Sequence, residues 1–332
     1  MQMLSLGDLA QSFLFARRGT EMKADIQRLS LELTTGLTQD PARHLAGDFG
    51  PLGGIDASLA RLTAYRSVTA EAGLFSQGMQ SAIGRVDTLA VDLGYALLAG
   101  SSPGNPVRVD ALAAEAVQKL DAALSALNTR IGDRSLFSGV DTAAKAVPDG
   151  AAFLATLQGV VAGVPTVDDL GTRLDDWFAS AAGYGAAYGG GAALAPLSIA
   201  PGEVARLDIT AAHPAIRDTL KGLAMAALLG TGLFTGQPEL RATVAMRAGE
   251  ALTRNQTDRV ELAAGLGRAE AQIEQAAQHN TAETSALGIA RTELLSVDGY
   301  EAASRLQATQ TQLETLYALT SRMQRLNLVN YL

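Results

Sequence analysis

The sequence predicts a mainly α protein: a long antiparallel helical bundle or coiled coil built from both chain ends, with a smaller mixed α/β insertion in mid-chain. Both ends carry apolar residues at helical spacing, and three stretches between them repeat that pattern. Short alternating runs, accompanied by proline and glycine, occur in the middle of the chain. Of the 332 residues, 48% are hydrophobic but only 5% are aromatic, so the apolar mass is mostly Ala and Leu and suits narrow helical seams.

The C-terminal segment, residues 297–332, contains no proline and a single glycine. Its apolar residues recur at alternating spacings of three and four, which places them on one seam of a helix, as in a coiled coil. These residues are Leu306, Thr309, Leu313, Leu316, Thr320 and Met323, followed by the apolar tail Leu326, Leu328, Val329, Tyr331 and Leu332. Chain ends usually fray and exposed apolar ends are a solubility liability, so this helix needs a partner.

The first segment, residues 1–33, is the expected partner because it carries two short seams of its own. The first consists of Leu9, Phe13 and Ala16, and the second of Met22, Ile26, Leu29 and Leu33. The offset between the two resembles a stutter in a heptad pattern. Gly36 follows as a plausible helix terminator. A hairpin of the two termini is the simplest way to bury both seams.

Three further long helices are predicted inward of the termini. Residues 37–54 form a connecting loop, and helices follow at 55–99 and 107–131, which we expect to pack antiparallel across a Gly/Pro turn. The third helix runs nearly unbroken from Glu239 to Leu295. Polar residues on or beside its seam could fix the register: Asn255, Gln256, Asn280 and Thr284.

Residues 140–203 differ in kind, since small residues, proline and glycine dominate there. The Gly-rich stretch 183–191 predicts a flexible loop. Alternating runs at 197–200 and 204–210 around Pro201-Gly202-Glu203 predict a β-hairpin, and His213-Pro214 marks a helix boundary. We therefore expect three regions: residues 1–40 with 296–332 as a terminal coiled-coil domain, 41–139 with 239–295 as a long-helix bundle, and 140–238 as a mixed α/β insertion.

Composition argues against several classes of function. The chain has no cysteine and three scattered histidines, so it offers no disulfide, thiolate metal site or nucleophilic constellation, and we expect no catalytic residue, cofactor or metal site. A net charge of −8 implies no nucleic-acid partner. The longest apolar run, residues 222–234, is too short and too glycine-broken to span a bilayer, so membrane insertion is not expected. The N-terminus also lacks the pattern of a secretory signal peptide.

Several short motifs resemble those of a known family. A helical N-terminus ending in Leu33-Thr34-Thr35-Gly36, followed by Asp40-Pro41, resembles the start of the flagellin superfamily. Leu136-Phe137-Ser138-Gly139 is similar to the motif that follows the corresponding helix in one of its branches, the flagellar hook-filament junction proteins (hook-associated protein 3 type). The ending of residues 326–332, LNLVNYL, also resembles that branch, whereas flagellins proper usually close with a different tail. Physically, Phe137 is a buried aromatic plug and Gly139 a turn residue.

The resemblance implies a structural subunit of the bacterial flagellum, forming the ring that joins hook to filament through its terminal helices. It implies an extracellular location reached without a cleaved signal peptide. The implied partners are other copies in the ring, the other hook-associated junction protein, flagellin and a flagellar export chaperone. The expected assembly seam comprises Leu9, Phe13, Met22, Ile26, Leu29, Leu33, Leu306, Leu313, Leu316, Met323, Leu326, Leu328, Tyr331 and Leu332.

Other functions remain open at this point. Flagellin itself, the filament subunit, is the nearest alternative, and the motif at 136–139 and the ending at 326–332 argue against it. An unrelated coiled-coil interaction protein would leave the paired terminal motifs unexplained. An enzyme comes last, because no catalytic constellation is present.

Overall fold

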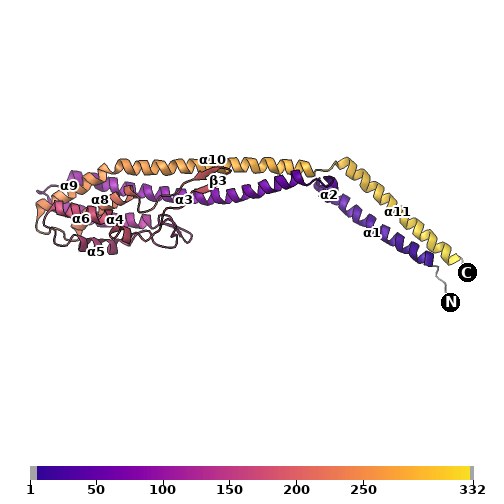
Figure 1. The fold of residues 1–332 in the computed structure, drawn as a ribbon, viewed down its shortest axis with the longest axis horizontal. Coiled ribbons are helices and arrows are strands. Elements are labelled where there is room, and N and C mark those ends of the chain that lie inside the picture. The colour runs from indigo at the N-terminus through magenta and orange to yellow at the C-terminus, as the bar shows by residue number, and fades with distance from the viewer. Residues whose placement is uncertain (1–5, 330–332) are drawn as a thin grey trace. The chain divides into compact units, whose positions relative to one another are not determined.

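The computed structural model describes the backbone of residues 6–329 and the side chains of residues 10–323 (Figure 1). Most of this chain is helical, and both ends form long helices, which confirms the mainly α prediction. The helices are α1 (Leu6–Thr35), α2 (Pro41–His44), α3 (Gly50–Gly100), α4 (Pro106–Leu127), α5 (Gly150–Val160), α6 (Val167–Ala179), α7 (Tyr184–Ala187), α8 (Pro214–Gly230), α9 (Pro238–Arg254), α10 (Gln256–Leu295) and α11 (Gly299–Val329). The strands are β1 (Arg130–Ile131), β2 (Arg134–Ser135), β3 (Leu197–Ala200) and β4 (Glu203–Ala205), in two antiparallel pairs.

The chain divides into two compact units rather than the three regions that the sequence suggested. The terminal unit comprises Met1–Leu62 and Ala282–Leu332, and the central unit comprises Thr63–Thr281. The predicted insertion does not separate from the long helices, because one hydrophobic cluster runs through both. That cluster takes residues from α3 and α4, from the segment between Leu136 and Leu207, and from α8, α9 and α10. The terminal unit also extends inward to include the start of α3 and the end of α10.

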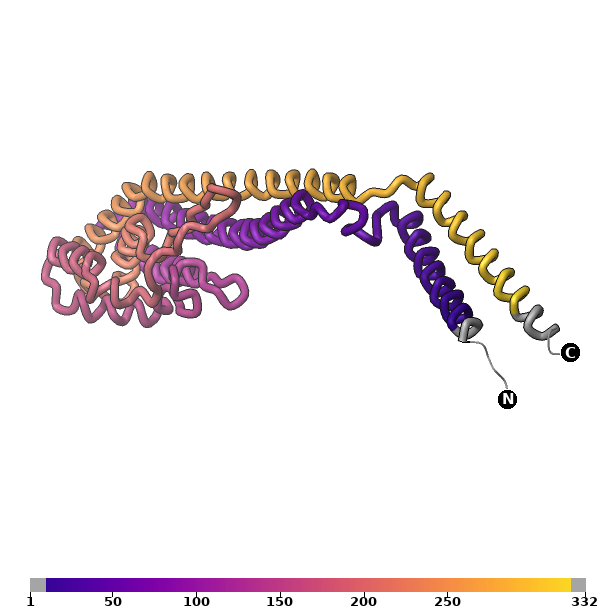
Figure 2. Tube along the Cα trace, turned by 45° about the vertical axis from the view of Figure 1, so that its right-hand side comes forward, coloured from indigo at the N-terminus to yellow at the C-terminus, as the bar shows by residue number. Residues whose placement is uncertain are grey.

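In the terminal unit, α1 and α11 lie side by side and run antiparallel (Figures 1 and 2). A Cβ atom at Gly19 would lie 3.7 Å from Leu316, and Leu29 lies near Ala302. Residues later in α1 therefore meet residues earlier in α11. This is the helical hairpin of the two termini that the sequence predicts.

The core of the central unit is built around α8. Twelve of its residues are buried, among them Leu220, Leu223 and Leu228, and it packs against α4 and α9. The second half of α8, residues 222–229, is buried on all sides, which accounts for the first part of the apolar run at 222–234. Within the described residues, no helix is both long and apolar enough to cross a membrane.

The turn at 101–105 reverses the chain, so α3 and the segment after it run antiparallel, as expected. Lys119 on α4 lies 3.8 Å from Asp92 on α3, and a Cβ atom at Gly100 would lie 2.8 Å from Leu112. The predicted helix at 107–131 is too long, however, because α4 ends at Leu127. The side-chain amide of Asn128 donates to the carbonyl of Val147 at 2.8 Å and accepts from its amide at 3.1 Å, so it ties the chain to another segment instead of continuing the helix.

The third long helix is also broken, at Asn255, into α9 and α10. The guanidinium of Arg259 is 3% exposed and donates to the carbonyl of Leu252 at 2.9 Å and to Asp87 at 2.7 Å. A side chain thus satisfies a carbonyl near the break, which lets the helix end there without an unpaired buried acceptor. The first of the long helices, α3, begins at Gly50 rather than at the predicted Ile55. Pro51 lies in its first turn, where the amide that proline lacks would have had no partner within the helix.

The predicted β-hairpin and the helix boundary at His213-Pro214 are confirmed. The second strand is shorter than the predicted run 204–210, because β4 ends at Ala205. β3 pairs with β4 across a turn in which Gly202 has φ +76°. His213 is the N-cap of α8, and its Nδ1 accepts a hydrogen bond from the Ala215 amide at 3.3 Å. Burial lowers the pKa of His213, which keeps the imidazole neutral and able to accept that bond.

The predicted flexible loop at 183–191 is wrong, because this stretch is packed. Tyr184 is buried and donates its hydroxyl to the carbonyl of Ala211 at 2.8 Å. The amide of Gly191 donates to the carbonyl of Ser138 at 2.9 Å. Composition alone suggested flexibility, but here the glycines allow two backbones to approach each other closely.

The motif at 136–139 is the surface on which that stretch docks. Phe137 is completely buried, and its carbonyl accepts from the Ala211 amide at 2.9 Å. Gly139 has φ +62°, and a Cβ atom there would overlap the carbonyl oxygen of Ala192. The motif therefore contributes a core side chain, Phe137, and a backbone surface at Gly139 against which Ala192 packs.

Gly139→Ala should accordingly lower the free energy of unfolding of the central unit by roughly 2–4 kcal/mol, through strain at positive φ plus the overlap with Ala192. The matched control is Gly163→Ala, where φ is +70° but no atom lies within 4 Å of the new Cβ, so only about 1 kcal/mol should be lost. Urea unfolding followed by circular dichroism compares the two. Equal losses would contradict the docked arrangement.

Candidate assembly surface

The inward stripe of α11 uses the predicted seam. Leu316 is buried, and the other predicted positions are partly buried along the α1–α11 contact. These are Leu306, Thr309, Leu313, Thr320 and Met323, with Ala302 extending the stripe by one turn. The spacing of four and three is kept throughout, as in a coiled coil.

The inward stripe of α1 differs from the predicted one in its first half. It consists of Phe15, Gly19, Met22, Ile26 and Leu29, and its spacing needs no stutter. Phe13 is 70% exposed and Leu33 is 42% exposed, so neither lies on the inward stripe. The reason is Gly19, which carries no apolar signal but makes room for Leu316. The predicted seam residues Leu9, Leu326, Leu328, Tyr331 and Leu332 lie outside the part of the chain whose side chains the structure describes.

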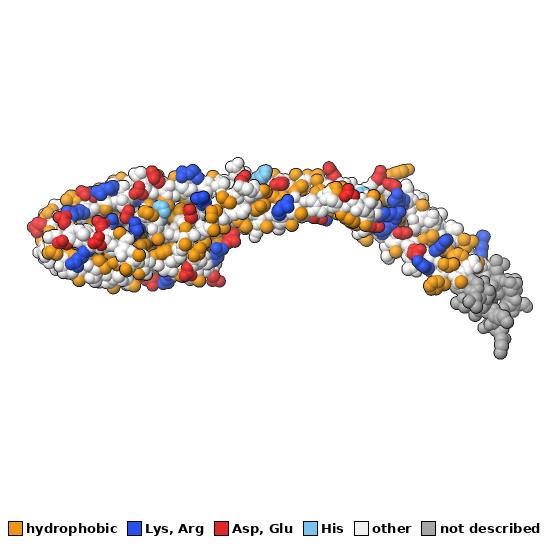
Figure 3. Space-filling model, viewed as in Figure 1, with side chains coloured by type: hydrophobic (Ala, Val, Ile, Leu, Met, Phe, Trp, Pro, Cys, Tyr) orange, Lys and Arg blue, Asp and Glu red, His pale blue; other side chains and the backbone are white. Residues whose placement is uncertain are grey.

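Several large apolar side chains of the helix pair remain exposed to solvent. We call them the outer residues: Phe13, Leu14, Leu31 and Leu33 on α1, and Tyr317 and Leu319 on α11. In Figure 3, hydrophobic side chains reach the surface of the terminal helices between charged ones. A soluble monomer rarely keeps so many apolar side chains exposed on two adjacent helices without using them for contacts. The outer residues are therefore the candidate assembly surface.

Backbone hydrogen bonds join the two places where the chain enters and leaves the helix pair. Gly36, with φ +70°, ends α1, and its carbonyl accepts from the amide of Val297 at 3.0 Å. The amide of Thr38 donates to the carbonyl of Leu295 at 2.9 Å, and Leu37 forms an antiparallel bridge with Ser296. We call this set of contacts the joint. It holds the end of α1 beside the start of α11.

The motif residues near the joint each have a local structural role. Thr35 donates its hydroxyl to the carbonyl of Leu31 at 2.8 Å and so closes the last turn of α1. Asp40 is the N-cap of α2 and accepts from the Arg43 amide at 3.2 Å, while Pro41 occupies the first turn.

Glu32 is a buried carboxylate at the joint that the sequence did not single out. It is 5% exposed, and its Oε1 accepts from the Gln39 amide at 3.0 Å and from Arg28 at 3.3 Å. A hydrogen bond from Arg28 to Asp25 at 2.8 Å raises the pKa of the guanidinium, which keeps it a cation beside Glu32. A buried charge needs partners of this kind. The position interrupts the apolar stripe of α1, which is why a pattern of apolar residues did not find it.

The described residues offer little reactive chemistry. Among residues 10–323, no three His, Asp or Glu side chains are grouped so that they could hold a metal ion. His44 is exposed, as expected for an ordinary surface residue. The carboxylates nearest the joint, Glu32, Asp40 and Asp298, are engaged in helix capping or ion pairing.

Comparison with known proteins finds a family similarity over the C-terminal part of the chain. Residues 249–332 match the family described as the bacterial flagellin C-terminal helical region. This match covers the end of α9 and all of α10 and α11, including the inward stripe of α11 and the outer residues Tyr317 and Leu319.

A solved structure from Vibrio parahaemolyticus, provisionally assigned as a flagellar hook-associated protein, resembles the chain at 11% identity. The similarity covers 73% of this chain and 95% of that one, with a TM-score of 0.49. No curated protein matches the chain.

Glu32→Ala should loosen the joint. It leaves the Gln39 amide without its acceptor and Arg28 without one carboxylate, and the loss should be roughly 1–3 kcal/mol. Faster amide hydrogen exchange at Thr38, Gln39 and Val297 would show it. Glu21→Ala is the matched control, because Glu21 pairs with Arg17 on the exposed face of the same helix and should contribute under about 0.5 kcal/mol. Unchanged exchange in Glu32→Ala would remove Glu32 from the joint.

Proposed function

We propose that this chain is a structural subunit of the bacterial flagellum that forms the ring joining the hook to the filament. The observation that carries the proposal is the flagellin-type match over 249–332. The match includes α11, which pairs with α1 and keeps the apolar side chains of Tyr317 and Leu319 exposed. The inward stripe holds one subunit's two termini together. The outer residues are then available for neighbouring subunits.

Burial energies give the proposal a physical scale. Burying a Leu or Phe side chain contributes about 1.5–3 kcal/mol, so six outer residues could contribute on the order of 10 kcal/mol, as an upper estimate. Association costs about 4–15 kcal/mol in lost translational and rotational freedom alone. A single pairwise contact would therefore be weak, whereas several neighbours around a ring would hold each subunit firmly.

The junction assignment, rather than a filament subunit, rests on the resemblance of residues 136–139 and 326–332 to the junction branch. The proposed partners are other copies of this chain, the other hook-associated junction protein, flagellin and an export chaperone. The proposed location is extracellular, at the base of the filament, after export without a cleaved signal peptide. No enzymatic role is proposed.

Phe13→Ser combined with Leu14→Ser should block assembly while leaving the isolated chain folded. Both side chains are exposed, so the free energy of unfolding should change by under about 0.5 kcal/mol per site. In a strain that carries only this variant, we expect hooks without filaments and flagellin released into the medium. Electron microscopy and blotting of the medium measure these outcomes.

Val107→Ser is the control, because Val107 is 77% exposed but belongs to α4 in the central unit. Strains carrying it should build normal filaments. Normal filaments in the Phe13/Leu14 variant would show that the outer residues are not the assembly surface. Immunogold labelling separates the junction from the filament: gold confined to a band above the hook supports the proposal, and gold along the whole filament supports the flagellin alternative.

A further inference from the structure

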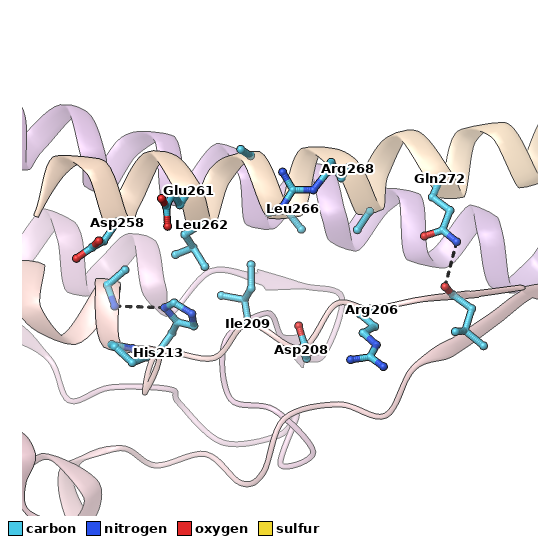
Figure 4. A pocket seen from close by; sticks show the side chains of 16 residues that line it. Arg206, Asp208, Ile209, His213, Asp258, Glu261, Leu262, Leu266, Arg268 and Gln272 are labelled. Atoms are coloured by element: carbon cyan, nitrogen blue, oxygen red, sulfur yellow. Dashed lines mark hydrogen bonds between the residues drawn. The ribbon is translucent and has the colours of Figure 1, made fainter.

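The central unit contains an open groove that the proposed assembly role does not use. Its volume is about 1070 Å³, and it lies between the extended segment 204–213 and one side of α10 (Figure 4). At one end the side-chain amide of Gln272 donates to the carbonyl of Val204 at 3.2 Å and spans the two walls. At the other end the N-terminus of α8, capped by His213, closes the gap.

One wall of the groove is the segment that continues from the end of β4 (Glu203–Ala205). β4 stops pairing with β3 at Ala205, but the next residues keep a strand-like alternation: Leu207 is buried, while Arg206 and Asp208 are exposed. Outside the β3–β4 ladder, and within the part of the chain that the structure describes, the backbone groups of residues 207–209 make no backbone–backbone hydrogen bond. An unpaired strand edge of this kind is a template for another strand.

The groove has the length and the lining that a short strand requires. The α10 wall runs from Asp258 to Gln272, which is about 21 Å at 1.5 Å per residue and matches about six residues of extended chain. Leu262 and Leu266 are buried side chains of that wall, and Ile209 faces them from the strand. Because Leu262 and Leu266 are already covered, an added strand would place its alternate apolar side chains against the partly buried Ile209 and Ala269.

The two ends of the groove carry opposite charge. Asp258 and Glu261 lie toward the His213 end, and Arg206 and Arg268 lie toward the Gln272 end (Figure 4). Asp208 lies between Ile209 and Arg206, so it offsets part of the positive charge at the second end. We infer that the groove binds an extended peptide strand of another protein, which pairs with the free edge of residues 207–209. Its cationic end lies beside Asp258 and Glu261, and its anionic end lies beside Arg206 and Arg268. This inference does not depend on the flagellar assignment.

Gly265 provides a substitution that blocks the groove without disturbing the fold. It lines the groove inside α10, and the nearest atom to a Cβ there would be Arg268 Nη2 at 3.8 Å. Gly265→Leu fills the space and also replaces a poor helix former with a good one, so the fold should become more stable. Gly267→Leu is the matched control: it makes the same change two residues along, where no atom lies within 4 Å, on a residue outside the groove lining.

The test titrates the purified full chain with the capped hexapeptide KVTVTE, followed by calorimetry and by NMR of the backbone amides. We expect binding to the wild-type chain and to Gly267→Leu, and affinity lower by about tenfold or more for Gly265→Leu. Methylation of alternate amides in the peptide should abolish binding, since strand pairing needs those donors. The peptide EVTVTE should bind more weakly, because it places a carboxylate beside Asp258 and Glu261.

Four results would overturn the inference. They are no binding of KVTVTE at about 1 mM, equal binding of the methylated peptide, equal binding of EVTVTE, and unchanged affinity in Gly265→Leu. Sedimentation of the chain alone tests the competing occupant. If the wild-type chain dimerises and Gly265→Leu does not, a second copy fills the groove and the assignment to another protein is wrong.

Discussion

The pairing of the first and last helices depends on a few backbone hydrogen bonds between residues 36–38 and 295–297. Apart from Leu316 and Ala302, the described apolar residues of the α11 stripe are only partly buried, so the apolar contact alone stabilises the pair weakly. The joint holds the end of α1 beside the start of α11. Contacts farther along the two helices then form between segments that are already held close together. Closing a loop once costs far less entropy than bringing two free segments together. Gly36 makes this arrangement possible, because its positive φ turns the chain while its carbonyl still reaches Val297.

The structure distinguishes residues that pair the two helices within one chain from residues that are free to contact other chains. The sequence pattern alone did not distinguish them. A coiled-coil seam read from spacing alone serves equally well for pairing within a chain or between chains. In the structure, Leu313 and Leu316 belong to contacts within one subunit, so replacing them would first disrupt the subunit itself. Phe13 and Leu33, predicted as part of the same seam, instead face outward. The surface proposed for assembly therefore consists largely of residues that did not fit the inward pattern.

The long-range helical plan could be predicted from the sequence because it follows from spacing. The helices at both ends, the hairpin at 197–205 and the boundary at His213 all have local signals, namely heptad periodicity, a Pro-Gly turn and a proline in the first helical turn. The break at Asn255 could not be predicted in this way. It depends on Arg259 reaching Leu252 and Asp87, and Asp87 lies far away in the sequence. Glu32 was missed for a similar reason, since its partners lie in the loop that follows α1.

Glycines also explain why the structure differs from the sequence prediction at residues 183–191. They further explain how a chain with few aromatic residues builds one core. A Cβ atom at Gly249 would lie 3.0 Å from the carbonyl of Gly94, so α9 and α3 can approach each other closely only because both positions lack a side chain. Gly139 allows the same closeness between the motif at 136–139 and Ala192. Close backbone approach increases the number of dispersion contacts that small side chains can make, and this replaces the volume that large side chains would otherwise supply. A pattern analysis assigns glycine-rich segments to loops, whereas in this protein several of them are the places where the backbones pack most tightly.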